Sequence, residues 1–156
     1  MRCYIWGTNN LEDRREPGRG VIAFVLPDWG IQYRAASVGS ALGCEYGALL
    51  AFLQFARDNP KVFEGQRVEI CSDSVAMVEQ VSRRIPVGPA ELKDWTLVRT
   101  LRTHVPFDLV WIPPDQNRAI EGVLDLAPRR DRIELRQTPL EPRPRSKKQS
   151  PPDVAL

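Results

Sequence analysis

Short apolar runs and turn residues alternate over the first forty residues of the chain. Three runs rich in β-branched and aromatic residues cover residues 2–6, 20–26 and 30–38, and turns containing Gly and Pro separate them. Runs of this length between turn residues are typical of consecutive strands joined by hairpins. The pattern therefore predicts three antiparallel strands that pair in chain order.

The spacing of apolar residues becomes helical over residues 44–58. The Asn59-Pro60 pair then predicts the end of this helix, because proline disfavours a helical conformation in the residue before it. One face of the helix collects the apolar side chains expected to be buried: Tyr46, Leu49, Leu50, Phe52, Leu53 and Ala56.

Strand-like and helical segments alternate over the next seventy residues. The predicted elements are a strand over 67–71, a helix that begins after Ser72-Asp73-Ser74, a helix that begins at Pro89, a strand over 107–112 and a helix over 117–127. The order predicts an α/β fold with a five-stranded mixed sheet flanked by helices. By the crossover rule, the fourth strand should lie parallel to the first and beside it.

Composition changes this picture only near the C-terminus. The chain has 156 residues, and its 22 Lys and Arg against 20 Asp and Glu give a net charge of +2. This balance excludes a polybasic protein that binds nucleic acid through bulk charge. From about Asp131, prolines alternate with Arg and Lys and aromatic residues disappear. We therefore expect one domain over residues 1–130 and a disordered Pro- and basic-rich tail over 131–156.

Cysteine and histidine usage is sparse. Cys3, Cys44 and Cys71 have no paired spacing, and His104 is the single histidine, which argues against a disulfide framework and a structural zinc site. The N-terminus lacks the features of a secretion signal, and the most apolar stretch, residues 46–56, is shorter than the ~20 residues that cross a bilayer. These features predict a soluble cytoplasmic protein with no membrane partner.

Two carboxylates lie where strand and helix signals meet. Glu45 begins the buried stripe of the first predicted helix, where it could simply be a first-turn acid stabilised by the helix dipole. Asp73 follows an apolar strand, where it could simply cap the next helix. A functional interpretation is also open for both, because functional groups in α/β proteins gather at the ends of strands.

The segments around these two acids carry a family resemblance. Residues 44–51 read Cys-Glu-Tyr-Gly-Ala-Leu-Leu-Ala, and residues 68–74 read Val-Glu-Ile-Cys-Ser-Asp-Ser before a helical Val-Ala-Met-Val-Glu-Gln-Val. Together with the element order and the turn over residues 17–20, they resemble type 1 ribonuclease H and the ribonuclease H domain of reverse transcriptases. The resemblance covers roughly residues 1–128 and implies a ribonuclease H-like fold.

The resemblance also implies a chemistry. The family cleaves the RNA strand of RNA/DNA hybrids with four carboxylates that hold two Mg²⁺ or Mn²⁺ ions, because two hard cations need a cluster of oxygen ligands. Glu45 matches the acid of the family's first helix, and Asp73 matches the acid after the fourth strand. Both would be metal ligands and catalytic residues.

The first acid of the family, an Asp followed by Gly, ends strand one. Here the stretch before the Pro-Gly turn reads Gly-Thr-Asn-Asn, so the resemblance implies that Asn9 or Asn10 takes this place, and Asn10 is preferred. An amide offers an oxygen ligand but no negative charge to share between two ions. Glu12 and Asp13 are the nearby substitutes, which would project from the hairpin loop.

The fourth acid belongs near the start of the last helix, four residues after an Asn. Asn117 and Glu121 have this spacing, which would place both on one helical face. Asp125 lies one turn further along the same stripe and is the rival match. Either acid could instead belong to the solvated side of an amphipathic helix.

Other positions depart from the family. The loop over residues 113–116 reads Pro-Pro-Asp-Gln and lacks the family's histidine, which His104 does not replace. The amides that precede the family's first-helix Glu are replaced by Ala-Leu-Gly over residues 41–43. Arginines in loops remain candidates for phosphate contacts, or are simply soluble surface: Arg15, Arg19 and Arg84.

The leading hypothesis is a ribonuclease H-like, metal-dependent nuclease acting on RNA/DNA hybrids, whose activity Asn10 weakens or removes. The alternative is a catalytically inactive ribonuclease H-like module that binds nucleic acid or, through the tail, a protein partner. A third is another nuclease of this superfold, such as an exonuclease or junction resolvase. A fold alone does not separate these hypotheses.

Overall fold

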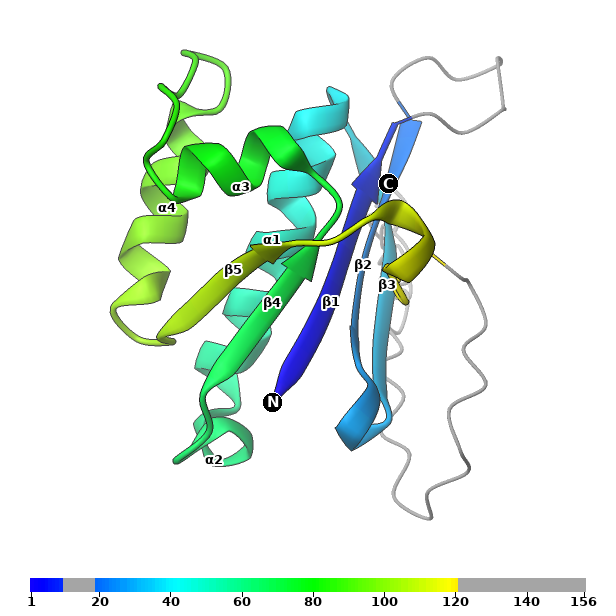
Figure 1. The fold of residues 1–156 in the computed structure, drawn as a ribbon, viewed down its shortest axis with the longest axis vertical. Coiled ribbons are helices and arrows are strands. Elements are labelled where there is room, and N and C mark those ends of the chain that lie inside the picture. Colours follow the sequence, from blue (N-terminus) through cyan, green and yellow to red (C-terminus); the bar gives the residue numbers. More distant parts are fainter. Residues whose placement is uncertain (10–18, 121–156) are drawn as a thin grey trace, which may run out of the picture.

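A five-stranded mixed sheet forms the centre of the protein (Figure 1). The computed structural model describes residues 1–9 and 19–120. The strand order is β3-β2-β1-β4-β5, with β1 antiparallel to β2, β2 antiparallel to β3, and β4 parallel to both β1 and β5. The strands are β1 (Arg2–Thr8), β2 (Arg19–Leu26), β3 (Ile31–Val38), β4 (Val68–Ser72) and β5 (Phe107–Trp111). The predicted fold class and the parallel pairing of the first and fourth strands are confirmed.

The long helix α1 lies across one face of the sheet, with α4 beside it (Figure 1). The helical elements are α1 (Ala41–Asp58), α2 (Pro60–Phe63), α3 (Val75–Val81), α4 (Leu92–Arg102) and the short 3-10 helices η1 (Pro27–Trp29) and η2 (Pro114–Gln116). All six apolar residues predicted on the buried face of α1 are buried. Phe52 of this face meets Phe24 of β2 edge to face, with ring centroids 5.6 Å apart. Burial of this stripe between sheet and α4 therefore fixes the position of α1.

Element boundaries differ from the prediction at three places. Helix α1 begins at Ala41, because the hydroxyl of Ser40 caps it by accepting a hydrogen bond from the Gly43 N–H at 3.0 Å. Helix α4 begins at Leu92, three residues after Pro89, which lies in a turn. Residues 118–120 form a turn at the expected start of the last helix. The rest of that helix, the domain boundary near residue 130 and the predicted tail lie outside the described residues.

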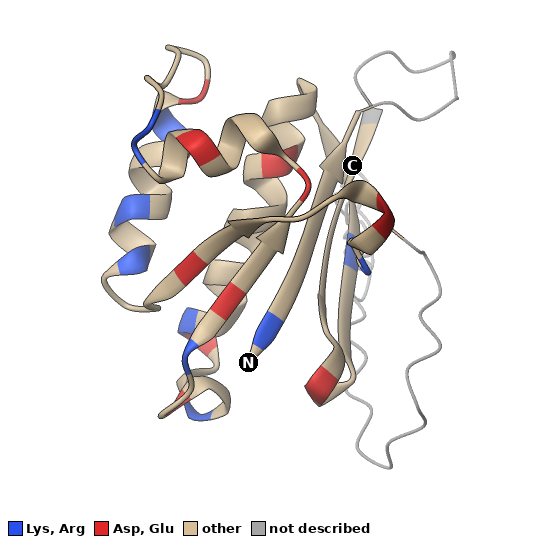
Figure 2. Cartoon of the chain, in the orientation of Figure 1, with Lys and Arg blue, Asp and Glu red and all other residues tan. Residues whose placement is uncertain are grey.

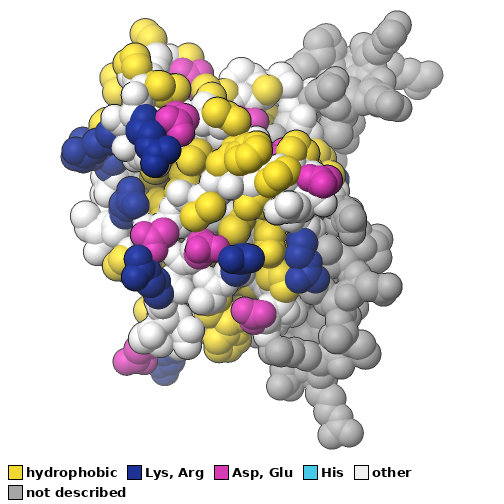
Figure 3. Space-filling view, viewed as in Figure 1, with side chains coloured by type: hydrophobic (Ala, Val, Ile, Leu, Met, Phe, Trp, Pro, Cys, Tyr) yellow, Lys and Arg dark blue, Asp and Glu magenta, His cyan; other side chains and the backbone are white. Residues whose placement is uncertain are grey.

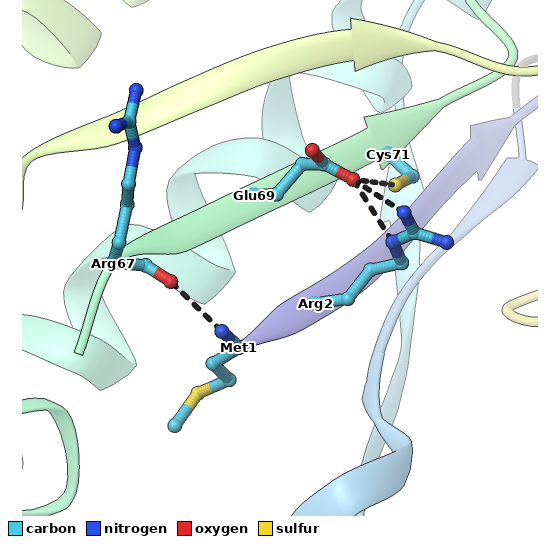
Figure 4. A network of polar contacts seen from close by, with 5 residues as sticks. All are labelled: Met1, Arg2, Arg67, Glu69 and Cys71. Atoms are coloured by element: carbon cyan, nitrogen blue, oxygen red, sulfur yellow. Dashed lines mark hydrogen bonds and ion pairs between the residues drawn. The ribbon is translucent and has the colours of Figure 1, made fainter.

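A polar network joins the amino ends of β1 and β4 (Figure 4). The N-terminal amine donates to the Arg67 carbonyl oxygen at 2.8 Å, and the Arg2 guanidinium pairs with the Glu69 carboxylate at 2.9 Å. The ion pair is exposed and contributes little stability. The network lies at the opposite end of β1 and β4 from Asp73, so it does not belong to the candidate site.

The sheet face turned away from α1 carries a group of apolar side chains, visible in Figure 3 among scattered charges. On this face Val110 of β5 is exposed, whereas Val25 of β2 is buried. The three cysteines are free and buried. Within residues 1–9 and 19–120, no helix is long and apolar enough to cross a membrane.

Candidate active site

The carboxyl ends of β1 and β4 lie side by side, because these strands are parallel neighbours. Ile5 pairs with Ser72 in the register, so Asp73 follows directly at the end of β4. The cap of α3 is Ser74, whose hydroxyl accepts a hydrogen bond from the Met77 N–H at 3.2 Å. The interpretation of Asp73 as a helix cap is therefore wrong. Its side chain is left to interact elsewhere.

Glu45 reaches the same end of the sheet from α1. Because the helix begins at Ala41, Glu45 belongs to its second turn, and the first turn holds no acid. The interpretation of Glu45 as a first-turn acid is therefore wrong as well. Its carboxylate instead accepts a hydrogen bond from the Ser74 hydroxyl. Acidic positions on α1 and on the loop after β4 lie close together in Figure 2.

A glycine in β1 allows this close approach. A Cβ at Gly7 would overlap the Cys44 carbonyl oxygen and lie 2.6 Å from the Glu45 backbone nitrogen. Only the absence of a side chain therefore lets the second turn of α1 rest against β1. The close contact holds the backbone of Glu45 at the end of the strand that neighbours Asp73.

Asn117 completes the arrangement from the loop after η2. Its side chain is 4% exposed, and its amide nitrogen donates to the Asp73 carboxylate at 2.8 Å and to the Ile5 carbonyl oxygen at 2.9 Å. Its amide oxygen accepts from the Ala119 N–H at 3.1 Å. One side chain thus fixes Asp73 against the end of β1. The sequence pointed to Asn117 only as the spacing mark for Glu121.

Burial and charge act together on Glu45. Burial raises the pKa of the Glu45 carboxyl, the neighbouring Asp73 charge raises it further, and the hydrogen bond from Ser74 opposes both. Clustering of Glu45 and Asp73 without a metal ion predicts that at least one of their pKa values is raised, and this is confirmed for Glu45. The larger cause is loss of solvation, and the like charge is a smaller one.

The other residues singled out from the sequence have different outcomes. Asn10, Arg15, Glu121 and Asp125 lie outside the described residues, as does the side chain of Arg19. Asn9 donates a hydrogen bond from its amide to the Gly39 carbonyl oxygen at 3.2 Å. Arg84 is exposed and pairs with the Glu79 carboxylate at 3.1 Å, so a phosphate would have to compete with that partner.

The described donors fit a single hard cation better than a pair. Glu45 and Asp73 offer carboxylate oxygens, and neither forms an ion pair with a Lys or Arg of residues 1–9 and 19–120. The local charge is therefore negative, as a divalent cation requires. No group of three or more His, Cys, Asp or Glu suited to a metal occurs within these residues. A two-ion site would need carboxylates from beyond them.

Solved structures share the fold of this chain, although no protein-family model and no curated protein matches it. The chain has the ribonuclease H fold. It matches the N-terminal RNase H domain of a Mycobacterium tuberculosis protein at 24% identity and a TM-score of 0.60, over 74% of this chain and 84% of that chain. RNase H1 from Halobacterium salinarum matches at 20% identity and a TM-score of 0.60, over 76% and 90%.

A further match is LC11-RNase H1, isolated from compost by a metagenomic approach. It is 23% identical with a TM-score of 0.65, and the match covers 77% of this chain and 89% of that chain. A second structure of LC11-RNase H1 contains an RNA/DNA hybrid. At these identities the likeness establishes the fold, and the resemblance to ribonuclease H noted in the sequence is confirmed at that level.

Proposed function

We propose that the chain is a ribonuclease H-like protein that binds RNA/DNA hybrids and hydrolyses their RNA strand weakly, with Mg²⁺ or Mn²⁺. The observation that carries this proposal is the convergence of Glu45 and Asp73 at the carboxyl ends of β1 and β4. Neither acid caps a helix, and their proximity costs free energy through desolvation and like-charge repulsion. A cost of this kind is typical of functional sites.

Chemistry at this site would follow from the residues that orient the two acids. Ser74 and Asn117 hold the carboxylates of Glu45 and Asp73 by hydrogen bonds, which limits their rotation. These carboxylates would hold the cation, with Glu121 as the preferred further ligand and Asp125 as the rival. A bound divalent cation would supply charge neutralisation at a phosphate and acidify a water molecule.

Activity should be weak because Asn9 and Asn10, the residues matched to the family's first acid, carry amides in place of a carboxylate. If Asn10 takes this place, the site loses one negative charge that two cations would share. LC11-RNase H1, a neighbour in fold, binds an RNA/DNA hybrid in its solved complex. That hybrid is therefore the first substrate to test.

The test measures hybrid binding and RNA-strand cleavage by the full chain, in Mg²⁺ and then in Mn²⁺. We expect binding and slow cleavage by the wild type, and no cleavage by Asp73→Asn, which keeps the size of the side chain and removes its charge. Glu64→Gln is the matched control, because Glu64 is exposed and lies just beyond α2. Failure of the wild type to bind the hybrid would refute the proposal.

A second candidate is a catalytically inactive module that binds nucleic acid or a protein partner. It is favoured by the lack of a third carboxylate beside Glu45 and Asp73 in the described part of the chain. Hybrid binding without cleavage in either metal, unchanged in Asp73→Asn, would support this candidate over the nuclease.

A further inference from the structure

We infer that Trp6, rather than Asn10, occupies the place beside Glu45 and Asp73 where a third carboxylate would complete a two-cation site. The wild-type site would therefore hold at most one divalent cation. This inference rests on the proposed function in one respect, since it treats the two acids as metal ligands. It concerns the residue that limits the site, which no comparison with known proteins assigns.

The sheet register places Trp6 next to Asp73. Ile5 pairs with Ser72 across β1 and β4, and the next residue of each strand is Trp6 and Asp73. Asn117 confirms the proximity, because its amide donates both to the Ile5 carbonyl, which is part of the peptide preceding Trp6, and to the Asp73 carboxylate. Position 6 therefore adjoins Asp73.

The backbone of position 6 also lies one residue from the Glu45 turn. Gly7 packs against the backbone of Cys44 and Glu45. Trp6 thus lies between the glycine that contacts the Glu45 turn and the peptide held to Asp73. An Asp followed by Gly, as in the family resemblance, would place its Asp at position 6, where this chain has Trp6-Gly7.

Asn9 is directed toward the β3 edge of the sheet, away from β4. Its amide donates to the Gly39 carbonyl oxygen just after β3, and β3 lies on the side of β1 opposite β4. Asn10 follows Asn9 and is two residues beyond the end of β1. Continuation of the strand register therefore favours position 6 over positions 9 and 10 as the neighbour of Asp73.

The side chain of Trp6 also disfavours a second cation. Trp6 packs with Tyr4 against Ala23, Val25 and Ala119 and offers no oxygen ligand. The Arg34 guanidinium lies over its ring, 5.3 Å from the centroid. Residue 6 thus carries an apolar ring and an associated positive charge instead of the carboxylate that a two-cation site would need.

The test is Mn²⁺ binding by the full chain, measured by titration calorimetry on Trp6→Asp, Trp6→Asn and Asn10→Asp. The Asp and Asn variants at position 6 lose the same ring and differ only in the carboxylate. We expect Trp6→Asp to bind Mn²⁺ about tenfold or more tightly than Trp6→Asn, a typical size for a group that supports a metal site. Asn10→Asp should bind like the wild type.

Equal affinities of folded Trp6→Asp and Trp6→Asn, or a gain in Asn10→Asp, would overturn the inference. If loss of the ring prevents folding of both position-6 variants, the wild type decides by its stoichiometry: at most one Mn²⁺ per chain supports the inference, and two overturn it. Hybrid binding by the wild type is measured separately. If the wild type fails to bind the hybrid while Trp6→Asp binds Mn²⁺ more tightly than Trp6→Asn, only the proposed function is refuted. If the wild type binds the hybrid while the two variants bind Mn²⁺ equally, only the inference is refuted.

Discussion

The Asn117 amide joins two parts of the chain that backbone pairing leaves separate, the peptide after Ile5 and the Asp73 side chain. Asn117→Ala would leave the buried Ile5 carbonyl and the Ala119 N–H without this partner. We expect a loss of about 1–3 kcal/mol in the free energy of unfolding. Denaturant titration measures it, and Arg118→Ala, at an exposed neighbour, should change little.

A second variant at the same position separates hydrogen bonding from volume. Asn117→Asp keeps the shape of the side chain, but at neutral pH it replaces the donor with an acceptor and places a charge beside Asp73. It should destabilise the protein at least as much as Asn117→Ala, and acidification should partly relieve the loss. A stability equal to that of the wild type at neutral pH would show that the amide donor contributes nothing.

The raised pKa of Glu45 makes a prediction about pH. A carboxyl whose pKa is higher in the folded than in the unfolded protein contributes stability while protonated, below the unfolded value of 4.5, and this contribution is lost as the pH rises through the folded value. Glu45→Gln, which cannot ionise and retains an oxygen acceptor for Ser74, should therefore be more stable than the wild type at pH 7. The difference should disappear below pH 4.5.

Thermal unfolding of the metal-free protein between acid and neutral pH measures this effect. The gain should be less than about 1 kcal/mol, because Glu45 is partly exposed and solvent screens its charge. Glu64→Gln, at an exposed site, controls for loss of a negative charge. A Glu45→Gln variant less stable than the wild type at pH 7 would show that the ionised carboxylate stabilises the fold.

At the scale of elements, the contact of β1 with α1 depends on one missing side chain. Gly7→Ala would force the second turn of α1 away from the strand, because the new Cβ meets backbone atoms that cannot rotate aside. We expect a loss of about 1–3 kcal/mol, the usual cost of overpacking, measured by thermal or denaturant unfolding.

Gly47→Ala is the matched control within the same helix. Its Cβ would meet only a side-chain methyl of Ile22, at 3.3 Å, and alanine has the higher helix propensity. It should leave stability nearly unchanged. If Gly7→Ala were equally neutral, the close approach of β1 and α1 would not be required by the fold.

The sequence predicted these elements well where apolar periodicity was strong. All six residues of the α1 stripe are buried, β1, β2 and β3 pair in chain order as the hairpins predicted, and β4 lies beside β1 and parallel to it. It could not predict the start of α1, because Ser40 acts as a cap only once the chain turns there. It also could not show that Ser74 rather than Asp73 caps α3, since both residue types are good caps.

The site was predictable in its acids and not in their surroundings. Local sequence motifs pointed to Glu45 and Asp73, whereas the neighbour relation of Trp6 to Asp73 depends on the register between strands more than sixty residues apart. The hydrogen bond from Asn117 to Ile5 could not be predicted for the same reason, because 112 residues separate its partners in the sequence. Contacts of this kind follow from the assembled sheet and leave no local signature.

At the scale of the whole molecule, the topology brings the acids together at the carboxyl ends of β1 and β4. Parallel β1 and β4 end together, and β3, which is antiparallel to β2, runs in the same direction as β1 and ends there too. The first turns of α1 therefore also lie at that end of the sheet (Figure 1). The ion pair of Arg2 with Glu69 lies at the opposite end of the same strands. A duplex bound at the acids would therefore approach the sheet from the carboxyl ends of β1 and β4.

The last prediction concerns the basic C-terminal segment, whose residues lie outside the described ones. Deleting residues 134–156 removes a stretch rich in proline and in charged side chains but without aromatic residues. Because such a stretch can bury little apolar area, we expect the melting temperature to stay nearly unchanged. Its positive charges should strengthen contact with phosphates, so hybrid affinity should fall modestly on deletion, more at low than at high salt.

The matched variant keeps the full length and replaces Arg143, Arg145, Lys147 and Lys148 with Gln. It should reproduce the loss of affinity and lower the slope of affinity against salt by up to roughly 0.9 for each phosphate contact removed. A large fall in melting temperature on deletion would show instead that this segment packs on the sheet domain.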